Sequence, residues 1–239
     1  MRRQRVCPGQ LDRIIGILTA RDMDVLSSIG TARFLTTRQL SRLHFFDKPT
    51  QSAATRSTNR TLAKLKDLHL IDSLERRIGG VRAGSASHVW GLAPAGGRLL
   101  ENTGAVPERP KWLREYEPSR HYLEHTLATA EVRLRLSEAE RRGNLTILEV
   151  QREPDCWRPY SAPGGGIAHL KPDLSIITAS GDFEDHWFIE IDLATERPAR
   201  VIQSCLGYQE YRHTGIEQRR VVVFPAFVMI VPTRRHKKA

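Results

Sequence analysis

The spacing of apolar residues in the first third of the chain predicts three helices. Capping-box patterns, in which a hydroxyl residue stands three positions before an acid or amide, precede the first two, at Thr19 and Thr36. The first helix is expected over residues 22–34, and the second follows Thr36 as far as Leu43. The third is expected from about residue 51 to residue 68.

Two sides of the third predicted helix differ in chemistry. One side carries the leucines, and another carries cations at i, i+4 spacing. The leucines are Leu62, Leu65 and Leu68, and the cations are Arg56, Arg60 and Lys64. We expect the apolar side in a core and the basic side against phosphates.

Two strands and a basic turn follow these helices. The runs "LIDSLERR" and "SHVWGLAP" have strand character. The first run ends with Arg76 and Arg77, and the Gly-rich segment between the runs carries Arg82. The segment "PAGGRLLE" predicts a closing helix. Three helices followed by a basic hairpin is the order of a winged helix-turn-helix, which we assign to residues 1–102, with residues 1–10 expected to be mobile.

A second domain is expected after a linker over residues 103–120, which is rich in proline and charge. A helical pattern begins at His121 and ends at Gly143, and three strand-like runs follow it: "LTILEVQ", "LKPDLSIIT" and "HWFIEIDL". A helix "RPARVIQSCLGYQEYRHT" and a last strand region "RRVVVFPAFVMIVP" complete the order α-β-β-β-α-β over residues 121–232. Residues 233–239 form a basic tail. The expected fold class is therefore α+β in two domains.

The composition indicates which class of partner the protein binds. Lys and Arg number 37 against 27 Asp and Glu, a formal net charge of +10, which predicts a polyanionic partner. No apolar run approaches the roughly 20 residues that a membrane-spanning helix needs, so nucleic acid is favoured over membrane. The three cysteines show no pairing or zinc-site spacing, which fits a reducing cytoplasm.

Candidate chemistry lies on the second and third strands of the second domain. Period-two alternation puts Glu190 and Asp192 on one face of their strand, and Asp173 can meet them if the two strands are adjacent. Carboxylates that converge on one point repel one another unless a divalent cation neutralises them. Such a cation could activate a water and stabilise charge on a phosphodiester.

At these residues the chain resembles the PD-(D/E)xK restriction-endonuclease-like superfamily, whose core has the same α-β-β-β-α-β order. More narrowly, it is similar to the replication-relaxation family of mobile elements, which includes the MobC-type plasmid relaxases. The similarity rests on the run His125 to Ala128 with Glu131, on Pro172-Asp173, and on the run Glu190 to Glu196.

This resemblance implies a restriction-endonuclease-like C-terminal domain that uses Mg²⁺ or Mn²⁺. The implied catalytic residues are Asp173, Glu190, Asp192, Lys171 and His125, and the implied metal ligands are Asp173, Glu190, Asp192 and Glu131. Asp192 stands where the superfamily usually has lysine, and Lys171 could substitute for it. The implied function is a DNA nickase of plasmid, phage or integrative-element replication or mobilisation, acting on double-stranded DNA with other transfer or replication proteins, and a homodimer is a further expectation.

Plainer interpretations stay open for each site residue. A carboxylate at a strand end could pair with Arg197 or Arg200, and Glu149 is an alternative fourth ligand to Glu131. A relaxase could use Tyr208 or Tyr211 as a nucleophile, but their spacing also suits one buried and one surface aromatic, which we favour. The whole protein could also be a noncatalytic DNA-binding regulator that keeps its second domain for dimerisation.

Overall fold

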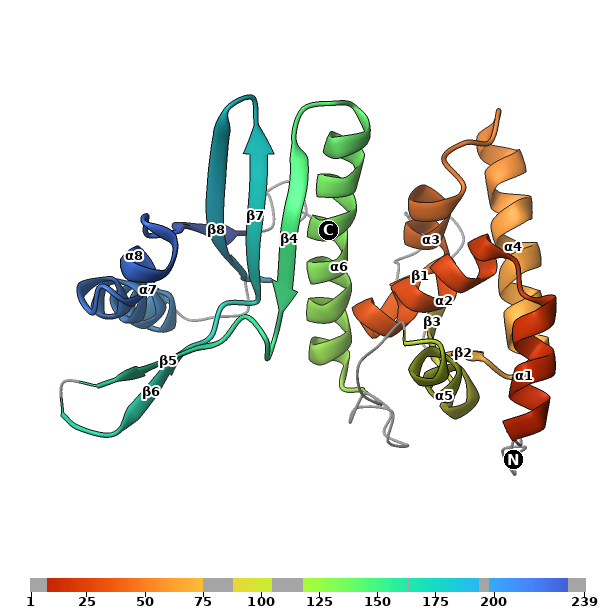
Figure 1. The fold of residues 1–239 in the computed structure, drawn as a ribbon, viewed down its shortest axis with the longest axis horizontal. Helices are drawn as coiled ribbons and strands as arrows, with labels where there is room; N and C mark the ends of the chain where they lie inside the picture. Colours follow the sequence, from red (N-terminus) through yellow and green to blue (C-terminus); the bar gives the residue numbers. More distant parts are fainter. Residues whose placement is uncertain (1–7, 75–87, 105–117, 163, 194–197, 232–239) are drawn as a thin grey trace. The chain divides into compact units, whose positions relative to one another are not determined.

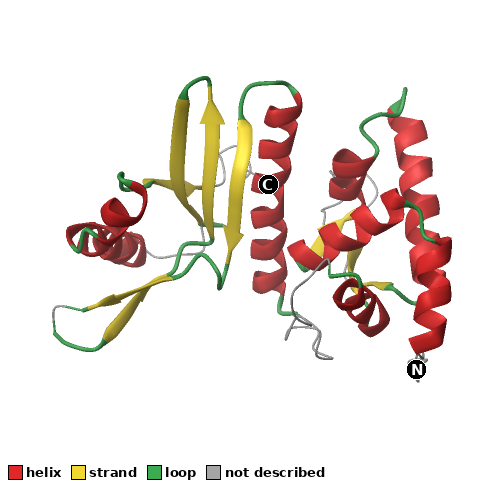
Figure 2. Ribbon diagram, viewed as in Figure 1, coloured by secondary structure: helices red, strands yellow, loops and turns green. Residues whose placement is uncertain are grey.

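The computed structural model describes residues 8–74, 88–104, 118–162, 164–193 and 198–231 (Figures 1 and 2). These residues form a mixed α+β fold of helices and several sheets. The chain divides into two compact units, Met1–Leu134 and Arg135–Ala239, which we call the N-terminal and C-terminal units.

The predicted helices of the N-terminal unit are confirmed, and an additional one precedes them. The helices are α1 (Pro8–Ile17), α2 (Ala20–Ala32), α3 (Thr37–His44), α4 (Gln51–Asp67) and α5 (Pro94–Asn102). Both capping boxes form, because Thr19 and Thr36 each accept a hydrogen bond from the third residue of the helix that follows. The expectation of mobility up to residue 10 is wrong for residues 8–10, which begin α1.

Helix α1 exists because its apolar residues have a core to join. Leu11 is 2% exposed and Ile14 is 5% exposed, and both belong to the apolar core of the N-terminal unit. These two residues lie one turn apart in a helix of ten residues, so the apolar pattern that indicates the helix is short. The basic residues before it favoured a mobile segment instead.

A three-stranded sheet accompanies the helices. Its strands are β1 (Phe34–Thr36), β2 (Ile71–Ser73) and β3 (Val89–Leu92), and both flanking strands pair antiparallel with the central β3. The two strands expected after the third helix are therefore confirmed. Strand β1 was not expected, because its three residues directly precede α3 and are too few for an alternation to show.

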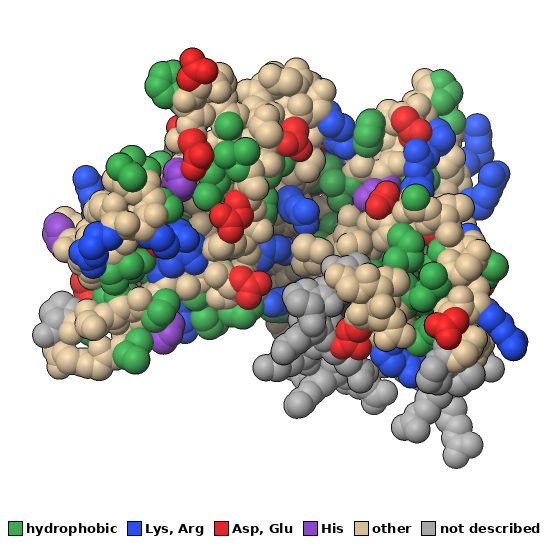
Figure 3. All heavy atoms as spheres, viewed as in Figure 1, with side chains coloured by type: hydrophobic (Ala, Val, Ile, Leu, Met, Phe, Trp, Pro, Cys, Tyr) green, Lys and Arg blue, Asp and Glu red, His purple; other side chains and the backbone are tan. Residues whose placement is uncertain are grey.

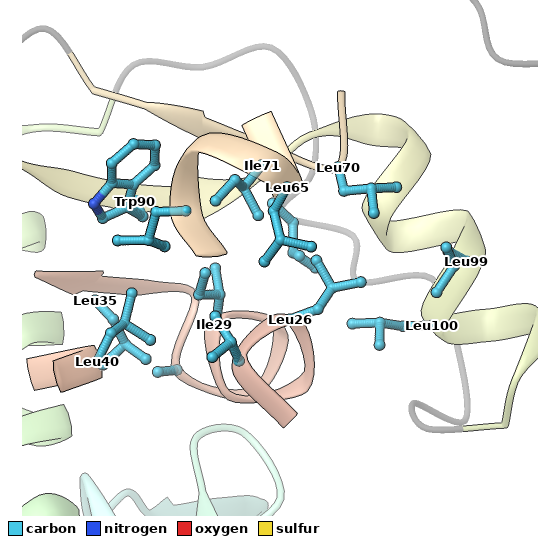
Figure 4. Close-up of a cluster of buried hydrophobic side chains, with 14 of the residues drawn as sticks. Leu26, Ile29, Leu35, Leu40, Leu65, Leu70, Ile71, Trp90, Leu99 and Leu100 are labelled. Atoms are coloured by element: carbon cyan, nitrogen blue, oxygen red, sulfur yellow. The ribbon is translucent and has the colours of Figure 1, made fainter. Parts of the chain in front are cut away.

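The core of the N-terminal unit lies between α2, α4, α5 and the sheet (Figure 4). Leu26 and Ile29 of α2 have no exposed surface and neither has Leu65 of α4. The sides of α4 divide as predicted for two of the three leucines, since Leu62 and Leu65 are buried while Leu68 is half-buried.

The C-terminal unit is built around a four-stranded sheet. Its strands are β4 (Thr146–Arg152), β7 (Leu174–Ser180), β8 (Phe183–Ile191) and β9 (Ala226–Ile230), in the order β4-β7-β8-β9. The first three pair antiparallel and β9 pairs parallel with β8, which it follows after α7 (Pro198–His213). The three strands and the helix that the sequence predicted are confirmed.

Two parts of the C-terminal unit differ from the sequence expectation. A hairpin of β5 (Arg158–Ser161) and β6 (Ile167–Leu170) was not expected, although its turn contains the "SAPGGG" run. The last strand region begins instead with helix α8 (Ile216–Val221), so that only β9 is strand. Helix α8 forms because its Glu217 is fully buried against Tyr211 and against Arg158, which lies 59 residues earlier in the sequence.

Helix α6 (Arg120–Arg141) contains the boundary between the two units. Its first turns belong to the N-terminal unit, where Leu123 and Leu127 form an apolar cluster with Val89 of β3. The sequence placed the division at residues 103–120 instead, and most of that segment lies outside the described residues. The pattern of α6 alone does not show which unit its first turns join.

Gly96 of α5 offers a test of this packing. A Cβ at this position would overlap the backbone carbonyl of Leu70, which accepts a hydrogen bond from Ala93 N. We expect Gly96→Ala to lower the free energy of unfolding by about 1–3 kcal/mol or more. Gly16→Ala in α1, where nothing lies within 4 Å of the added atom, is the control and should leave stability equal or raise it by up to about 1 kcal/mol. Urea unfolding measures both, and equal effects would contradict the close approach.

Candidate nucleic-acid interface and acidic site

Helix α4 has one continuous face toward solvent. Its exposed positions are Gln51, Ser52, Thr55, Arg56, Asn59, Arg60, Ala63, Lys66 and Asp67. From Ser52 to Lys66 this face carries hydroxyl, amide and cationic groups but no carboxylate. In Figure 3, Lys and Arg side chains stand out along the edge of the N-terminal unit where α4 lies.

The cations that the sequence assigned to α4 do not share one role. Arg56 and Arg60 are exposed, and Arg56 donates to the Ser52 hydroxyl one turn earlier, at 2.9 Å. Lys64 is half-buried and points back into its own unit, where its ammonium donates to Asp22 Oδ2 at 2.6 Å and to the Ile17 carbonyl at 2.8 Å. The basic side thus consists of two outward arginines and one inward lysine.

The partner of Lys64 is itself a capping residue. Asp22 is 3% exposed, and its Oδ2 also accepts from Thr19 N at the start of α2. Burial opposes ionisation of this carboxyl, but the hydrogen bonds from Lys64 and Thr19 outweigh it and lower the pKa of Asp22. One carboxylate therefore holds α2 and α4 together.

The basic residues expected between β2 and β3, namely Arg76, Arg77 and Arg82, lie outside the described residues. The strands on either side are held firmly to α3 and α4. Trp90 of β3 donates from its indole nitrogen to Thr37 at 2.9 Å, and Lys66 of α4 donates to Ser73 of β2 at 3.3 Å.

Asp173 and Glu190 occupy neighbouring strands of the C-terminal unit. The pairing of β7 with β8 ends at Leu174 and Ile189, so Asp173, which directly precedes β7, and Glu190 of β8 lie at the same end of the two strands. Backbone contacts fix this end of the sheet, because Asp173 N donates to the Ile189 carbonyl at 3.0 Å and Ile191 N donates to Asp173 Oδ2 at 2.7 Å. Both carboxyl groups lie close enough to Tyr208 to raise the pKa of its phenol.

Tyr208 of α7 covers this end of the sheet. Its hydroxyl donates to Glu190 Oε1 at 2.8 Å, and its ring packs against Phe188 and Phe227. Burial, together with the nearby carboxylate of Glu190, raises the pKa of Tyr208. The phenol is therefore held neutral as a hydrogen-bond donor.

Both tyrosines of α7 are buried. Tyr208 is 4% exposed and Tyr211 is 1% exposed, so the expectation that one of them would lie on the surface is wrong. Tyr211 donates to Glu217 at 2.9 Å and packs beside Tyr160. A single turn of α7 can bury both because the sheet and the β5-β6 hairpin supply partners that the sequence does not reveal.

Asp192 and Lys171 stand at the ends of the two strands. The backbone N–H of Asp192 donates to the Ile230 carbonyl, but its Oδ1 is buried and has no hydrogen-bond partner among the described residues. The Lys171 ammonium lies 4.6 Å from the centre of the Trp157 ring, a cation–π contact. Arg197 lies outside the described residues.

His125 and Glu131 belong to the N-terminal unit rather than to the unit that holds the acidic pair. Glu131 accepts from Arg42 at 2.7 Å and from Gln39 at 3.4 Å, and Gln39 also donates to the Leu127 carbonyl. These contacts tie α6 to α3. Within the described ranges, no group of three or more His, Cys, Asp or Glu side chains is arranged to hold a metal ion.

A buried ionic network that the sequence does not suggest lies beside the acidic pair. Glu217 is fully buried and accepts from Arg158 at 2.9 Å and from Arg220 at 3.0 Å. Arg158 also donates to Gln151 at 2.8 Å, and its guanidinium lies over the Phe188 ring. Because 59 residues separate Arg158 from Glu217, no local pattern could have indicated this pair.

Comparison with family models decides the family. The replication-relaxation model matches residues 26–227, which covers most of both units. The chain belongs to the replication-relaxation family. The match confirms the resemblance seen in the sequence, and membership points to the replication or mobilisation of plasmids and other mobile elements. Searches of curated proteins and of solved structures found no match.

No helix in the described ranges combines the length and the apolar character needed to cross a membrane.

The raised pKa of Tyr208 predicts how stability changes with pH. A phenol whose pKa is higher in the folded state than its usual value of about 10 stabilises the fold below that pH and loses this contribution as pH rises further. The expected slope is about 1.4 kcal/mol per pH unit for one such group. We therefore expect the stability difference between the parent protein and Tyr208→Phe to shrink between pH 9 and pH 11.

Urea unfolding at pH 8, 10 and 11 measures this difference. At pH 8 the variant should be less stable by about 1–3 kcal/mol, because Glu190 loses its phenolic donor. A difference that stays constant up to pH 11 would show that Tyr208 ionises in the folded protein as readily as in the unfolded chain.

Proposed function

We propose that this protein binds duplex DNA in the replication or mobilisation of a mobile genetic element, with the N-terminal unit as a winged helix-turn-helix. The order α2, β1, α3, α4, β2 and β3, with β3 central in the sheet, supports this assignment. In such a motif the second helix of the turn enters the major groove, and here that helix is α4.

The observation that carries the proposal is the carboxylate-free face of α4. A carboxylate on the face that enters a groove is unfavourable because the phosphates repel it at close range. From Ser52 to Lys66 the exposed side chains are hydrogen-bonding, small or cationic. The excess of cations over acids in the whole chain, a formal charge of +10, acts in the same direction.

Replacing Arg56 and Arg60 together with alanine should weaken duplex binding and reduce its salt dependence by about one to two counterions. Both side chains are exposed, so the fold should be retained. The matched control is Arg141→Ala with Arg142→Ala, which removes the same charge from exposed positions of the C-terminal unit. Fluorescence anisotropy with a labelled duplex between 50 and about 300 mM salt measures both slopes.

An unchanged salt slope in the Arg56 and Arg60 variant would show that α4 does not face the phosphates. An equal loss in the control would show that net charge alone governs binding.

Metal-dependent DNA nicking at the acidic pair is the second candidate function. It is favoured by Asp192, whose buried Oδ1 lacks a partner among the described residues, as an oxygen meant for a cation or an ordered water would. Asp173, Glu190 and Asp192 are the residues that would hold Mg²⁺ or Mn²⁺, which would supply Lewis-acid chemistry. The described residues do not by themselves form a group of three ligands, so we place DNA binding first.

The second candidate predicts that the protein converts supercoiled plasmid to open circles in Mn²⁺ but not in EDTA, and that Asp173→Asn and Glu190→Gln both lose this activity. Glu190→Gln is informative because a glutamine oxygen can still accept from Tyr208, so the charge is removed while the hydrogen bond is kept. Asp185→Asn, an exposed acid on the same strand, is the control. Nicking that persists in both site variants would assign the cut to a contaminant or to other residues.

A further inference from the structure

The exposed side chains of α4 are arranged around its axis in a definite order. Successive residues of a helix are about 100° apart. On this basis Asn59 lies near the middle of the exposed arc, in line with Ser52 two turns earlier and Ala63 one turn later. Arg56 and Arg60 lie along one flank of the arc, and Thr55 and Lys66 lie along the other.

Asn59 has its side-chain amide available. The two neighbouring polar residues are engaged within the helix, since the Thr55 hydroxyl donates to the Gln51 carbonyl at 2.8 Å and Ser52 accepts from Arg56. No hydrogen bond joins the Asn59 side chain to another described residue, although it stands at the centre of the face.

The residue in line with Asn59 on the next turn is small. Ala63 is exposed and adds only a methyl group to the surface, so the middle of α4 can approach a partner closely. Cations on the two flanks match phosphates on either side of a groove, whereas a central amide meets the groove floor. The major groove is about 12 Å wide and admits a helix in this way.

We propose that Asn59 reads an adenine in the major groove, while Arg56 and Arg60 contact phosphates beside it. This inference rests on the proposed DNA binding and goes further, because it assigns the base-reading residue and its base. An asparagine amide offers one donor and one acceptor side by side, which match N7 and N6 of adenine. Arg60 lies at the rim of the exposed arc and contributes affinity without base preference.

The test is selection of binding sites by the full-length protein from a pool of duplexes with a randomised centre. The parent protein should enrich adenine at one position or at symmetric positions. Asn59→Ala should lose the preference there by about 5- to 100-fold while binding the unselected pool within about two-fold of the parent. Arg60→Ala should weaken binding to selected and unselected duplexes alike.

Asn102→Ala, which removes an exposed amide at the end of α5, is the control and should change neither property. A preserved adenine preference in Asn59→Ala, or binding by the parent without base preference, overturns the assignment while leaving DNA binding intact. No binding of the unselected pool by the parent protein overturns the proposed function as well. Because Asn59 is exposed, unfolding in urea should show that its variant folds like the parent.

Discussion

The carboxylate of Asp22 is the contact on which the N-terminal unit depends. It closes the capping box of α2 and accepts the ammonium of Lys64, so two helices meet on one buried charge. A buried carboxylate is tolerated only when such donors satisfy it. Because Lys64 is held inward, the orientation of α4 about its axis is fixed, with its buried leucines in the core and its arginines and Asn59 exposed.

The C-terminal unit also contains a buried carboxylate that is satisfied by several hydrogen-bond donors. Glu217 has no exposed surface and is surrounded by two guanidinium groups and a phenol, which belong to three different elements. The network holds the β5-β6 hairpin and α8 against α7, and α7 in turn brings Tyr208 to Glu190. The ionic network therefore fixes the helix whose Tyr208 donates to Glu190.

Local sequence patterns predicted the helices and strands that local contacts stabilise. Capping boxes, helical spacing and strand alternation placed α2, α3, α4 and most of the central sheet, and the order of strands brought Asp173 beside Glu190. Contacts between distant residues could not be predicted in this way. The inward turn of Lys64, the burial of both tyrosines of α7 and the burial of Glu217 in α8 all depend on partners many residues away.

Helix α6 decides how this protein can be dissected. Its first two turns cover Val89 with Leu123 and Leu127, and its Glu131 receives Arg42 of α3. A fragment that stops at the end of α5 would leave this apolar strip open to water, and such a strip favours aggregation of the fragment. The smallest autonomous piece that keeps α4 in place therefore extends past the start of α6, and a recombined gene that exchanged the N-terminal unit would have to carry that stretch of helix with it.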